Sequence, residues 1–134
     1  MTGESFYLDA SVALRILYAQ SPAASVWFEQ VTGEDDTIVF SSRLLRTEIT
    51  RVLRRDRRTL ELRDEILDYL QFMPIDDGVL IEAETIIPHV KTLDAIHLAS
   101  VIRSGLDATV VTHDSNMAAV ATMIGYPVLD PVTD

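Results

Sequence analysis

The chain has 134 residues, no cysteine and a formal net charge of −10 at neutral pH. This length is typical of one domain and is enough to bury a core, and an apolar content of 48% argues against a disordered chain. The absence of cysteine excludes disulfides and thiolate metal sites, and no apolar run is long enough to span a membrane. We therefore expect one soluble, cytoplasmic domain over residues 1–134, with no membrane partner.

The first half of the chain alternates between β-rich segments and segments with helical spacing of apolar residues. In chain order we predict a strand over 6–8, helices over 10–19 and 22–32, a strand over 37–40, a helix that contains Leu44 to Leu53, and a helix from Thr59 to about Gln71. Ser21 followed by Pro22 is typical of a helix start, and Ser41 or Ser42 can cap the helix after the second strand.

The second half continues the alternation. We predict a strand over 72–75, a helix from about 78 to 87, a helix over 93–104 with Thr92 as its cap, a strand over 108–112, a helix that opens at 113–115 and ends at Gly125, and a short segment over 128–129 that would add a fifth strand. Strands that alternate with helices are typical of a parallel sheet with helices on both faces. The sequence therefore predicts an α/β fold with a central parallel sheet of four to five strands.

Four acidic residues occupy related positions in this alternation. Asp9, Glu48, Asp94 and Asp114 each lie just after a predicted strand or in the first turns of a predicted helix. Ligands of an open parallel sheet bind beyond the carboxyl ends of the strands, so these side chains can converge there. Converging carboxylates repel one another and normally require a hard cation such as Mg²⁺ or Mn²⁺. Such ions support phosphodiester hydrolysis by activating water, which is the chemistry we expect.

Each acid also has a purely structural explanation when it is considered alone. Asp9 and Asp114 can cap the helices that follow them, and Asp94 can favour a helix dipole. Glu48 lies inside a helix, where it can pair with Arg51, Arg55 or Arg43.

Polar neighbours could support a cation site. Ser11, Thr112 and Asn116 lie within two residues of Asp9 or Asp114, where hydroxyl and amide groups can assist a cation or form turns. His97 is expected to be a core residue with satisfied hydrogen bonds, and no histidine-rich set indicates zinc.

The basic residues are concentrated in one segment. Eight of the eleven lie between positions 43 and 63, and these are Arg43, Arg46, Arg51, Arg54, Arg55, Arg57, Arg58 and Arg63. A local positive field beside an acidic metal site could hold a phosphate backbone. The same arginines could instead pair with Glu61, Asp64 and Glu65 or bind an acidic protein, and both explanations remain open.

The segments around the four acids resemble the motifs of PIN-domain ribonucleases, and more closely those of the VapC-type toxins of bacterial toxin–antitoxin pairs. The first motif is Tyr7-Leu8-Asp9-Ala10-Ser11, the second runs from Ser42 to Ile49, the third from Leu93 to Ala99, and the fourth from Val111 to Asp114. The third is the most specific, and the four occur in the family's order over nearly the whole chain.

This resemblance implies a three-layer α/β/α fold over residues 1–134 and an Mg²⁺-dependent (or Mn²⁺-dependent) endoribonuclease. It also implies a homodimer, and a cognate antitoxin that covers the active site. By position, Asp9, Glu48, Asp94 and Asp114 would be the catalytic acids that bind metal, with hydroxyl support from Ser11 and Thr112. One departure follows Asp114, where the family often has arginines and this chain has Ser115-Asn116-Met117. That departure concerns how the RNA is held, and Arg43, Arg46, Arg51, Arg54 and Arg55 could compensate or contact the antitoxin.

Two other classes of protein share this alternation. A response-regulator receiver has acids after its first strand, but it would need a phosphoacceptor such as Asp76 or Asp77 and a lysine after the fifth strand, and no lysine follows Lys91. A haloacid-dehalogenase-type phosphatase would have an aspartate at position 11, where this chain has serine. A catalytically silent binding module with the same architecture is the third alternative, against which the four intact acids argue.

Overall fold

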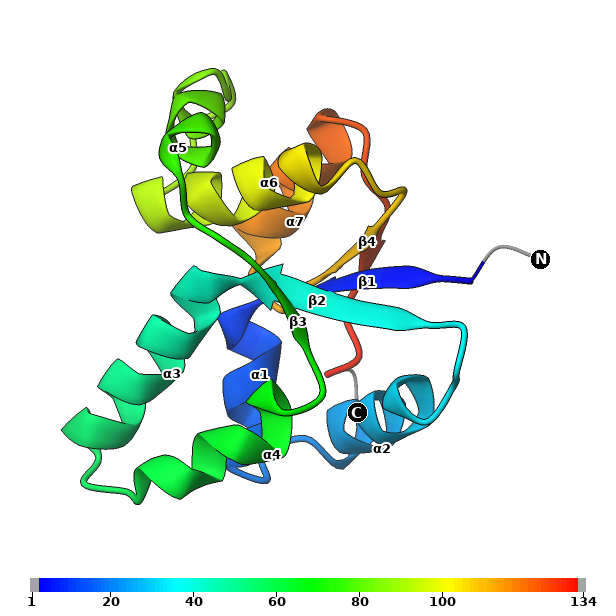
Figure 1. The fold of residues 1–134 in the computed structure, drawn as a ribbon, viewed down its shortest axis with the longest axis vertical. Helices are drawn as coiled ribbons and strands as arrows, with labels where there is room; N and C mark the ends of the chain where they lie inside the picture. The colour runs from blue at the N-terminus through cyan, green and yellow to red at the C-terminus, as the bar shows by residue number, and fades with distance from the viewer. Residues whose placement is uncertain (1–2, 133–134) are drawn as a thin grey trace.

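The computed structural model describes residues 3–132, which form a parallel sheet between two layers of helices (Figure 1). The strands are β1 (Ser5–Leu8), β2 (Ile38–Ser42), β3 (Gln71–Met73), β4 (Thr109–Val111) and β5 (Val128–Leu129). Their order across the sheet is β3-β2-β1-β4-β5, and every neighbouring pair is parallel. The α/β fold with a central parallel sheet that the alternation predicts is therefore confirmed, and it has five strands.

One face of the sheet is covered by helices from the first half of the chain. These are α1 (Ala10–Leu17), α2 (Pro22–Thr32), α3 (Arg43–Arg55), the 3₁₀ helix η1 (Leu60–Arg63) and α4 (Asp64–Leu67). Phe6 and Leu8 of β1 are buried in the apolar core on this face, together with Leu45 and Ile49 of α3. Figure 1 shows α3 running away from the sheet and α4 returning beside it, so the two form an arm.

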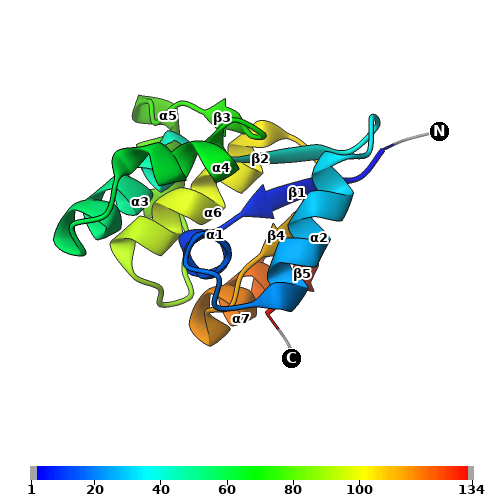
Figure 2. The same cartoon turned by 90° about the horizontal axis from the view of Figure 1, so that it is seen from below.

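The other face is covered by α5 (Asp77–Glu84), α6 (Thr92–Ser104) and α7 (Ser115–Met123). Tyr7 of β1 points into this second core, where Phe40, Leu98 and Met117 are also buried. Neighbouring residues of β1 enter different cores because successive side chains of a strand point to opposite faces. Figure 1 shows α5, α6 and α7 above the strands and α1 to α4 below them, and Figure 2 looks onto the sheet from the side of α1 and α2.

The helix ends agree with most of the expected signals. Ser21 accepts a hydrogen bond from Ala24 N at 3.1 Å, and Ser42 accepts one from Leu44 N at 3.0 Å. Ser41 lies in β2 and donates to the Leu8 carbonyl at 2.7 Å, so Ser42 alone is the cap. Gly105 ends α6 with a φ of 70°, a left-handed conformation that glycine adopts without strain.

Two of the expected element boundaries are wrong. The predicted helix from Thr59 to Gln71 is divided into η1 and α4 and ends at Leu67, and the following residues turn into β3. Thr92 does not cap α6 but is its first residue, and Lys91 occupies the cap position without a side-chain hydrogen bond.

No helix within residues 3–132 combines the length and apolarity that a membrane span requires.

Candidate active site

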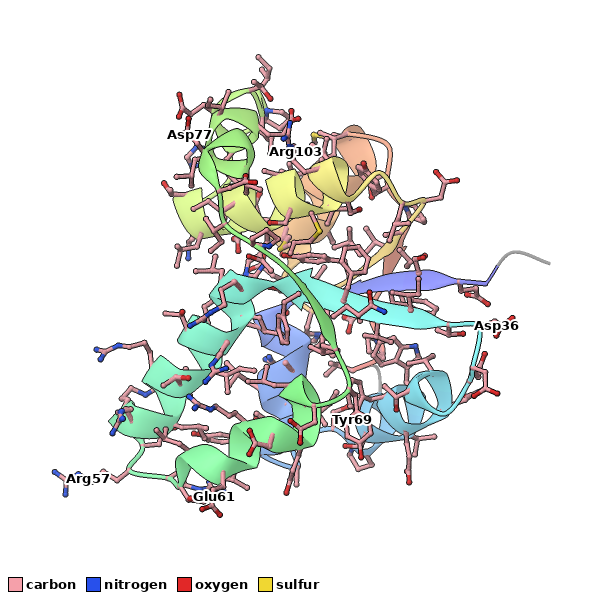
Figure 3. All side chains as sticks on the ribbon, viewed as in Figure 1. Asp36, Arg57, Glu61, Tyr69, Asp77 and Arg103 are labelled. Carbon is pink, nitrogen blue, oxygen red and sulfur yellow. The ribbon has the colours of Figure 1, made fainter. Side chains whose placement is uncertain are left out.

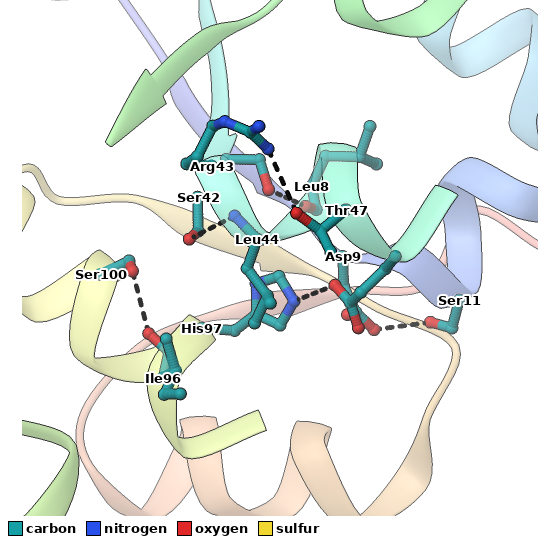
Figure 4. Close-up of polar contacts among 12 residues, drawn as sticks. Leu8, Asp9, Ser11, Ser42, Arg43, Leu44, Thr47, Ile96, His97 and Ser100 are labelled. Atoms are coloured by element: carbon teal, nitrogen blue, oxygen red, sulfur yellow. Dashed lines mark hydrogen bonds and ion pairs between the residues drawn. The ribbon is translucent and has the colours of Figure 1, made fainter. Parts of the chain in front are cut away.

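Asp9 directly follows β1, and its side chain is almost fully buried at the carboxyl end of the sheet. Ser11 Oγ donates to Asp9 Oδ2 at 2.7 Å (Figure 4), and Thr112 Oγ1 donates to the same oxygen at 2.8 Å. The carboxylate makes no capping bond to α1, so the capping explanation of Asp9 is wrong. The other oxygen, Oδ1, receives no hydrogen bond from the part of the chain that the structure describes, and is free for a further ligand.

The two hydroxyls that hold Asp9 also connect it to the start of α7. Ser11 Oγ accepts a hydrogen bond from the backbone N–H of His113 at 2.9 Å. Thr112 Oγ1 accepts one from the backbone N–H of Asp114 at 3.1 Å. The His113 ring is exposed, with Nδ1 2.8 Å from Asp130 Oδ2. The hydrogen bonds of these two hydroxyls therefore connect the end of β1 to the junction between β4 and α7.

Asp114 caps α7, as its structural explanation predicts. Its Oδ1 accepts a hydrogen bond from Met117 N at 2.8 Å, which occupies one carboxylate oxygen and leaves the other for a different partner. Asn116 is exposed, and its Nδ2 donates to the His89 carbonyl at 3.4 Å. The Asn116 amide is therefore engaged with the loop between α5 and α6.

Glu48 reaches the same end of the sheet from α3, but it does not pair with an arginine. Its Oε1 lies 2.5 Å from His97 Nε2, and His97 Nδ1 lies 2.6 Å from the Tyr7 hydroxyl. His97 is completely buried, so the expectation of a core histidine with satisfied hydrogen bonds is confirmed. Burial alone would lower the pKa of His97, but the hydrogen bond and charge of Glu48, with smaller effects from Asp9 and Asp94, raise it.

Asp94 lies in the first turn of α6 and is partly buried. Burial raises the pKa of the Asp94 carboxyl, and the negative charges of Asp9, Asp114 and Glu48 raise it further, against a smaller opposing effect of His97. Charges that perturb one another in this way lie within electrostatic reach. The structure thus brings all four predicted acids to one end of the sheet, from β1, α3, α6 and the β4–α7 junction.

The donor groups fit a hard divalent cation, although they are not gathered around one point. Within residues 3–132, no three histidine or acidic side chains stand close enough to form a ready-made metal site. Carboxylate and hydroxyl oxygens are the ligands that Mg²⁺ and Mn²⁺ prefer. A cation at this end of the sheet would offset both the burial of Asp94 and the neighbouring negative charges that raise its pKa.

The arginines of the arm are mostly exposed and mostly unpaired. Arg43, Arg46, Arg51 and Arg63 line a depression of about 240 Å³ on α3, with Thr47 and Thr50 between them. Arg55 pairs with Asp56 at 2.9 Å, whereas Glu61, Asp64 and Glu65 form no ion pair with any described arginine, so that predicted pairing is wrong. Arg57 projects from the outer end of the arm (Figure 3).

A second depression lies between α1 and α3. It has a volume of about 380 Å³ and is lined by Arg15, Tyr18, Val52 and Arg55, among others. Arg15 follows Ser11 by one helical turn and donates to its carbonyl at 2.8 Å. A larger depression, about 480 Å³, lies between α5 and α6 and includes none of the four acids. Volume alone therefore does not locate the acidic site.

Comparison with protein families matches residues 6–123 to the PIN domain. The chain belongs to the PIN domain family. The resemblance to PIN domains of VapC type that the four motifs indicate is thus confirmed.

The PIN domain is also similar to individual proteins along almost its whole length. It is 29% identical over 130 residues to Ribonuclease VapC46 of Mycobacterium tuberculosis. The aligned region covers 95% of this chain and 98% of that protein. A chain in the crystal structure of VapBC2 from Rickettsia felis, bound to a promoter DNA fragment, has a TM-score of 0.71 at 10% identity and covers 93% and 97% of the two chains. A chain in a toxin–antitoxin complex from Klebsiella pneumoniae has a TM-score of 0.70 at 16% identity and covers 94% and 97%.

Sequence reasoning did not find the contacts of Glu48. Tyr7 was assigned only to the first strand, and His97 only to the core. The available signal is that both side chains can form hydrogen bonds and lie within the acidic motifs, Tyr7 two residues before Asp9 and His97 three residues after Asp94. Helical spacing pointed instead to the arginines one turn from Glu48, because spacing describes neighbours on one helix and says nothing about a different helix.

Proposed function

We propose that this PIN domain is a metal-dependent endoribonuclease that acts as the toxin of a toxin–antitoxin pair. The observation that carries the proposal is that Asp9, Glu48, Asp94 and Asp114 lie at one end of the sheet, close enough for the negative charges of the other three to raise the pKa of Asp94. Membership of the PIN family and similarity to a protein named as a ribonuclease support the same activity.

Asp9, Glu48, Asp94 and Asp114 would hold Mg²⁺ or Mn²⁺. When bound, the ion supplies charge neutralisation at the scissile phosphate and lowers the pKa of a coordinated water. The reaction is hydrolysis of a phosphodiester bond, in which water attacks phosphorus and the 3′ oxygen leaves and takes up a proton. Ser11 and Thr112 fix the orientation of Asp9 through Oδ2, which keeps Oδ1 turned toward the site.

The receiver-like alternative does not agree with the strand order. Flavodoxin-like sheets place the third strand beside the first, in the order 2-1-3-4-5, whereas here β4 lies beside β1 and β3 is at the edge. Asp76 caps α5 and follows that edge strand, so it is separated from Asp9 by β2. A catalytically silent PIN domain is the remaining alternative, and the cleavage experiment below decides it.

The proposed macromolecular partners are an RNA strand, a cognate antitoxin and a second copy of this chain. RNA would enter from the side of the arm, where Arg43, Arg46, Arg51, Arg54 and Arg55 are exposed and Arg15 lines the depression between α1 and α3. The antitoxin and the homodimer rest on the VapC-type resemblance, and light scattering of the purified chain, alone and with the product of a neighbouring gene, tests both. A cytoplasmic location remains a prediction from composition.

The decisive experiment compares cleavage of single-stranded RNA by the wild type and by Asp9→Asn and Asp94→Asn. Both variants keep the size of the side chain and remove a charge, so we expect folded proteins without Mg²⁺-dependent cleavage. Asp68→Asn, at the exposed position directly after α4, is the matched control and should cleave normally. Full cleavage by either site variant would refute the metal-site assignment, and no cleavage by the wild type on any RNA would favour the silent module.

A further inference from the structure

Glu48 is held differently from the other acids of the site. Asp9 is fixed by two hydroxyls close to the sheet, and Asp114 is fixed by its own helix. Glu48 has a longer side chain, comes from the opposite helical layer to α6, and has His97 as its one hydrogen-bond partner among residues 3–132. Without that partner the side chain would be free to rotate, and ordering it for a ligand would cost conformational entropy.

The hydrogen-bond pattern defines the direction of each contact. An ionised carboxylate only accepts hydrogen bonds, so the proton between His97 and Glu48 is assigned to His97 Nε2. In the neutral ring, Nδ1 then accepts from the Tyr7 hydroxyl. A tyrosine hydroxyl is protonated at neutral pH and can therefore donate. Nε2–H faces Glu48 in both protonation states of the ring, and in the neutral ring the Tyr7 hydroxyl favours the tautomer that presents it.

The two rings are also fixed by packing. Tyr7 packs edge-on against Phe40, with ring centroids 5.2 Å apart, and against His97, with centroids 5.7 Å apart. Both Tyr7 and His97 have 0% exposure, so neither can touch an RNA substrate. Their effect on the site must therefore pass through the Glu48 carboxylate.

We propose that Tyr7 and His97 are positioning residues that hold the Glu48 carboxylate in place for a divalent cation. This role rests on the proposed function, because it assumes that Glu48 contributes to the metal site. The hydrogen-bonded chain runs from β1 through α6 to α3 and so joins both helical layers beyond the end of the sheet. Partners of this kind orient metal ligands, and their loss typically weakens metal binding by about 10- to 100-fold.

Two substitutions of His97 by amide residues distinguish a role in positioning Glu48 from a role in core packing alone. The amide of His97→Gln can reach the position of Nε2 and donate to Glu48, whereas the amide of His97→Asn reaches only the position of Nδ1, near Tyr7. Mn²⁺ and Mg²⁺ affinity is measured by titration calorimetry without RNA, beside single-turnover cleavage and thermal unfolding. We expect His97→Asn to weaken metal binding by about 10- to 100-fold and His97→Gln to restore most of it.

Tyr7→Phe tests the hydrogen bond between Tyr7 and His97, and this test does not depend on the folding of a His97 variant. It removes one buried oxygen, and we expect a smaller loss of metal affinity, below about tenfold. Tyr126→Phe, which removes a hydroxyl at a distant half-buried position, should bind metal as the wild type does.

Wild-type metal affinity in folded His97→Asn would overturn the role of His97, and wild-type affinity in Tyr7→Phe would overturn that of Tyr7. Equal losses in His97→Asn and His97→Gln would also overturn the proposal, because core packing would then explain both. Glu48→Gln distinguishes these failures from a failure of the proposed function. If Glu48→Gln itself binds metal normally, the assignment of Glu48 to the metal site is the part that is wrong.

Discussion

His97 Nε2 and Glu48 Oε1 lie 2.5 Å apart, although His97 belongs to α6 on one side of the sheet and Glu48 to α3 on the other. The contact crosses the carboxyl end of the sheet, where β1 and β2 end and no strand separates the two helical layers. One proposed metal-site acid is therefore also a structural link between the layers, and its removal should affect stability as well as activity.

Glu48→Ala should destabilise the protein without metal. The substitution leaves the buried His97 N–H without its acceptor, and an unsatisfied buried donor costs about 1–3 kcal/mol. Urea unfolding monitored by circular dichroism measures the change. Glu65→Ala, at an exposed position on α4, is the matched control, and an equal loss in both variants would contradict a special role for the contact.

Asp94→Asn should have the opposite effect on stability. Burial and the charges of Asp9, Asp114 and Glu48 raise the pKa of Asp94 in the folded state, so the folded protein binds more protons than the unfolded chain just above the ordinary aspartate range. Stability contributed by this group is therefore lost as the pH rises through that window, and at neutral pH the ionised carboxylate is unfavourable.

A neutral amide removes this penalty. We expect Asp94→Asn to unfold at a higher temperature than the wild type at pH 7 without metal, and the difference to shrink near pH 4. Thermal unfolding in chelator across this pH range tests the prediction. A lower unfolding temperature at pH 7 would show that repulsion among the acids is not significant.

Mg²⁺ should stabilise the wild type and not the Asp94→Asn variant. A ligand that binds only the folded state increases the free energy of unfolding. The increase grows with ligand concentration and is about 2.7 kcal/mol at roughly 100 times its Kd. Thermal unfolding with increasing Mg²⁺, with ionic strength held constant, measures the effect. The same shift in the variant would mean that the ion binds elsewhere.

Thr112→Val should reduce cleavage through Asp9. Valine has almost the shape of threonine but cannot donate to Asp9 Oδ2, so the carboxylate loses one of its two hydroxyl contacts. Hydrogen bonds to charged groups are worth about 1.5–3 kcal/mol, which corresponds to roughly a 10- to 100-fold loss of single-turnover rate if the whole contact is used in the transition state. Thr122→Val on α7, far along the helix from Asp114, is the matched control.

Replacing Arg51, Arg54 and Arg55 with alanine should weaken RNA binding in a salt-dependent manner. Each lost phosphate contact should make the slope of log K against log salt shallower by about 0.7 for a single strand. Fluorescence anisotropy with the inactive Asp9→Asn protein measures binding without cleavage. Arg103→Ala, on the opposite helical layer (Figure 3), is the control. If the triple substitution weakened antitoxin binding and left RNA binding unchanged, the three arginines would form a protein interface.

The sequence by itself determined the alternation of strands and helices, and with it the α/β class. The apolar runs before Asp9 and Asp114 and the caps at Ser21 and Ser42 are local signals, and local signals persist in the folded protein because they act between near neighbours. The positions of the four acids after the strands also indicated one end of the sheet, because the carboxyl ends of parallel strands share one edge, and their role as metal ligands stays a prediction.

Only the tertiary structure decided how each acid is held. Asp9 looked like a helix cap and Glu48 like the partner of an arginine, yet their contacts are Ser11 and Thr112 in the first case and His97 in the second. Asp9 and Thr112, like Glu48 and His97, lie far apart in the chain, and periodicity carries no information about which side chains meet across such a separation. The order β3-β2-β1-β4-β5 sets these pairings, because it places β4 beside β1 and lets α3 and α6 converge beyond the sheet.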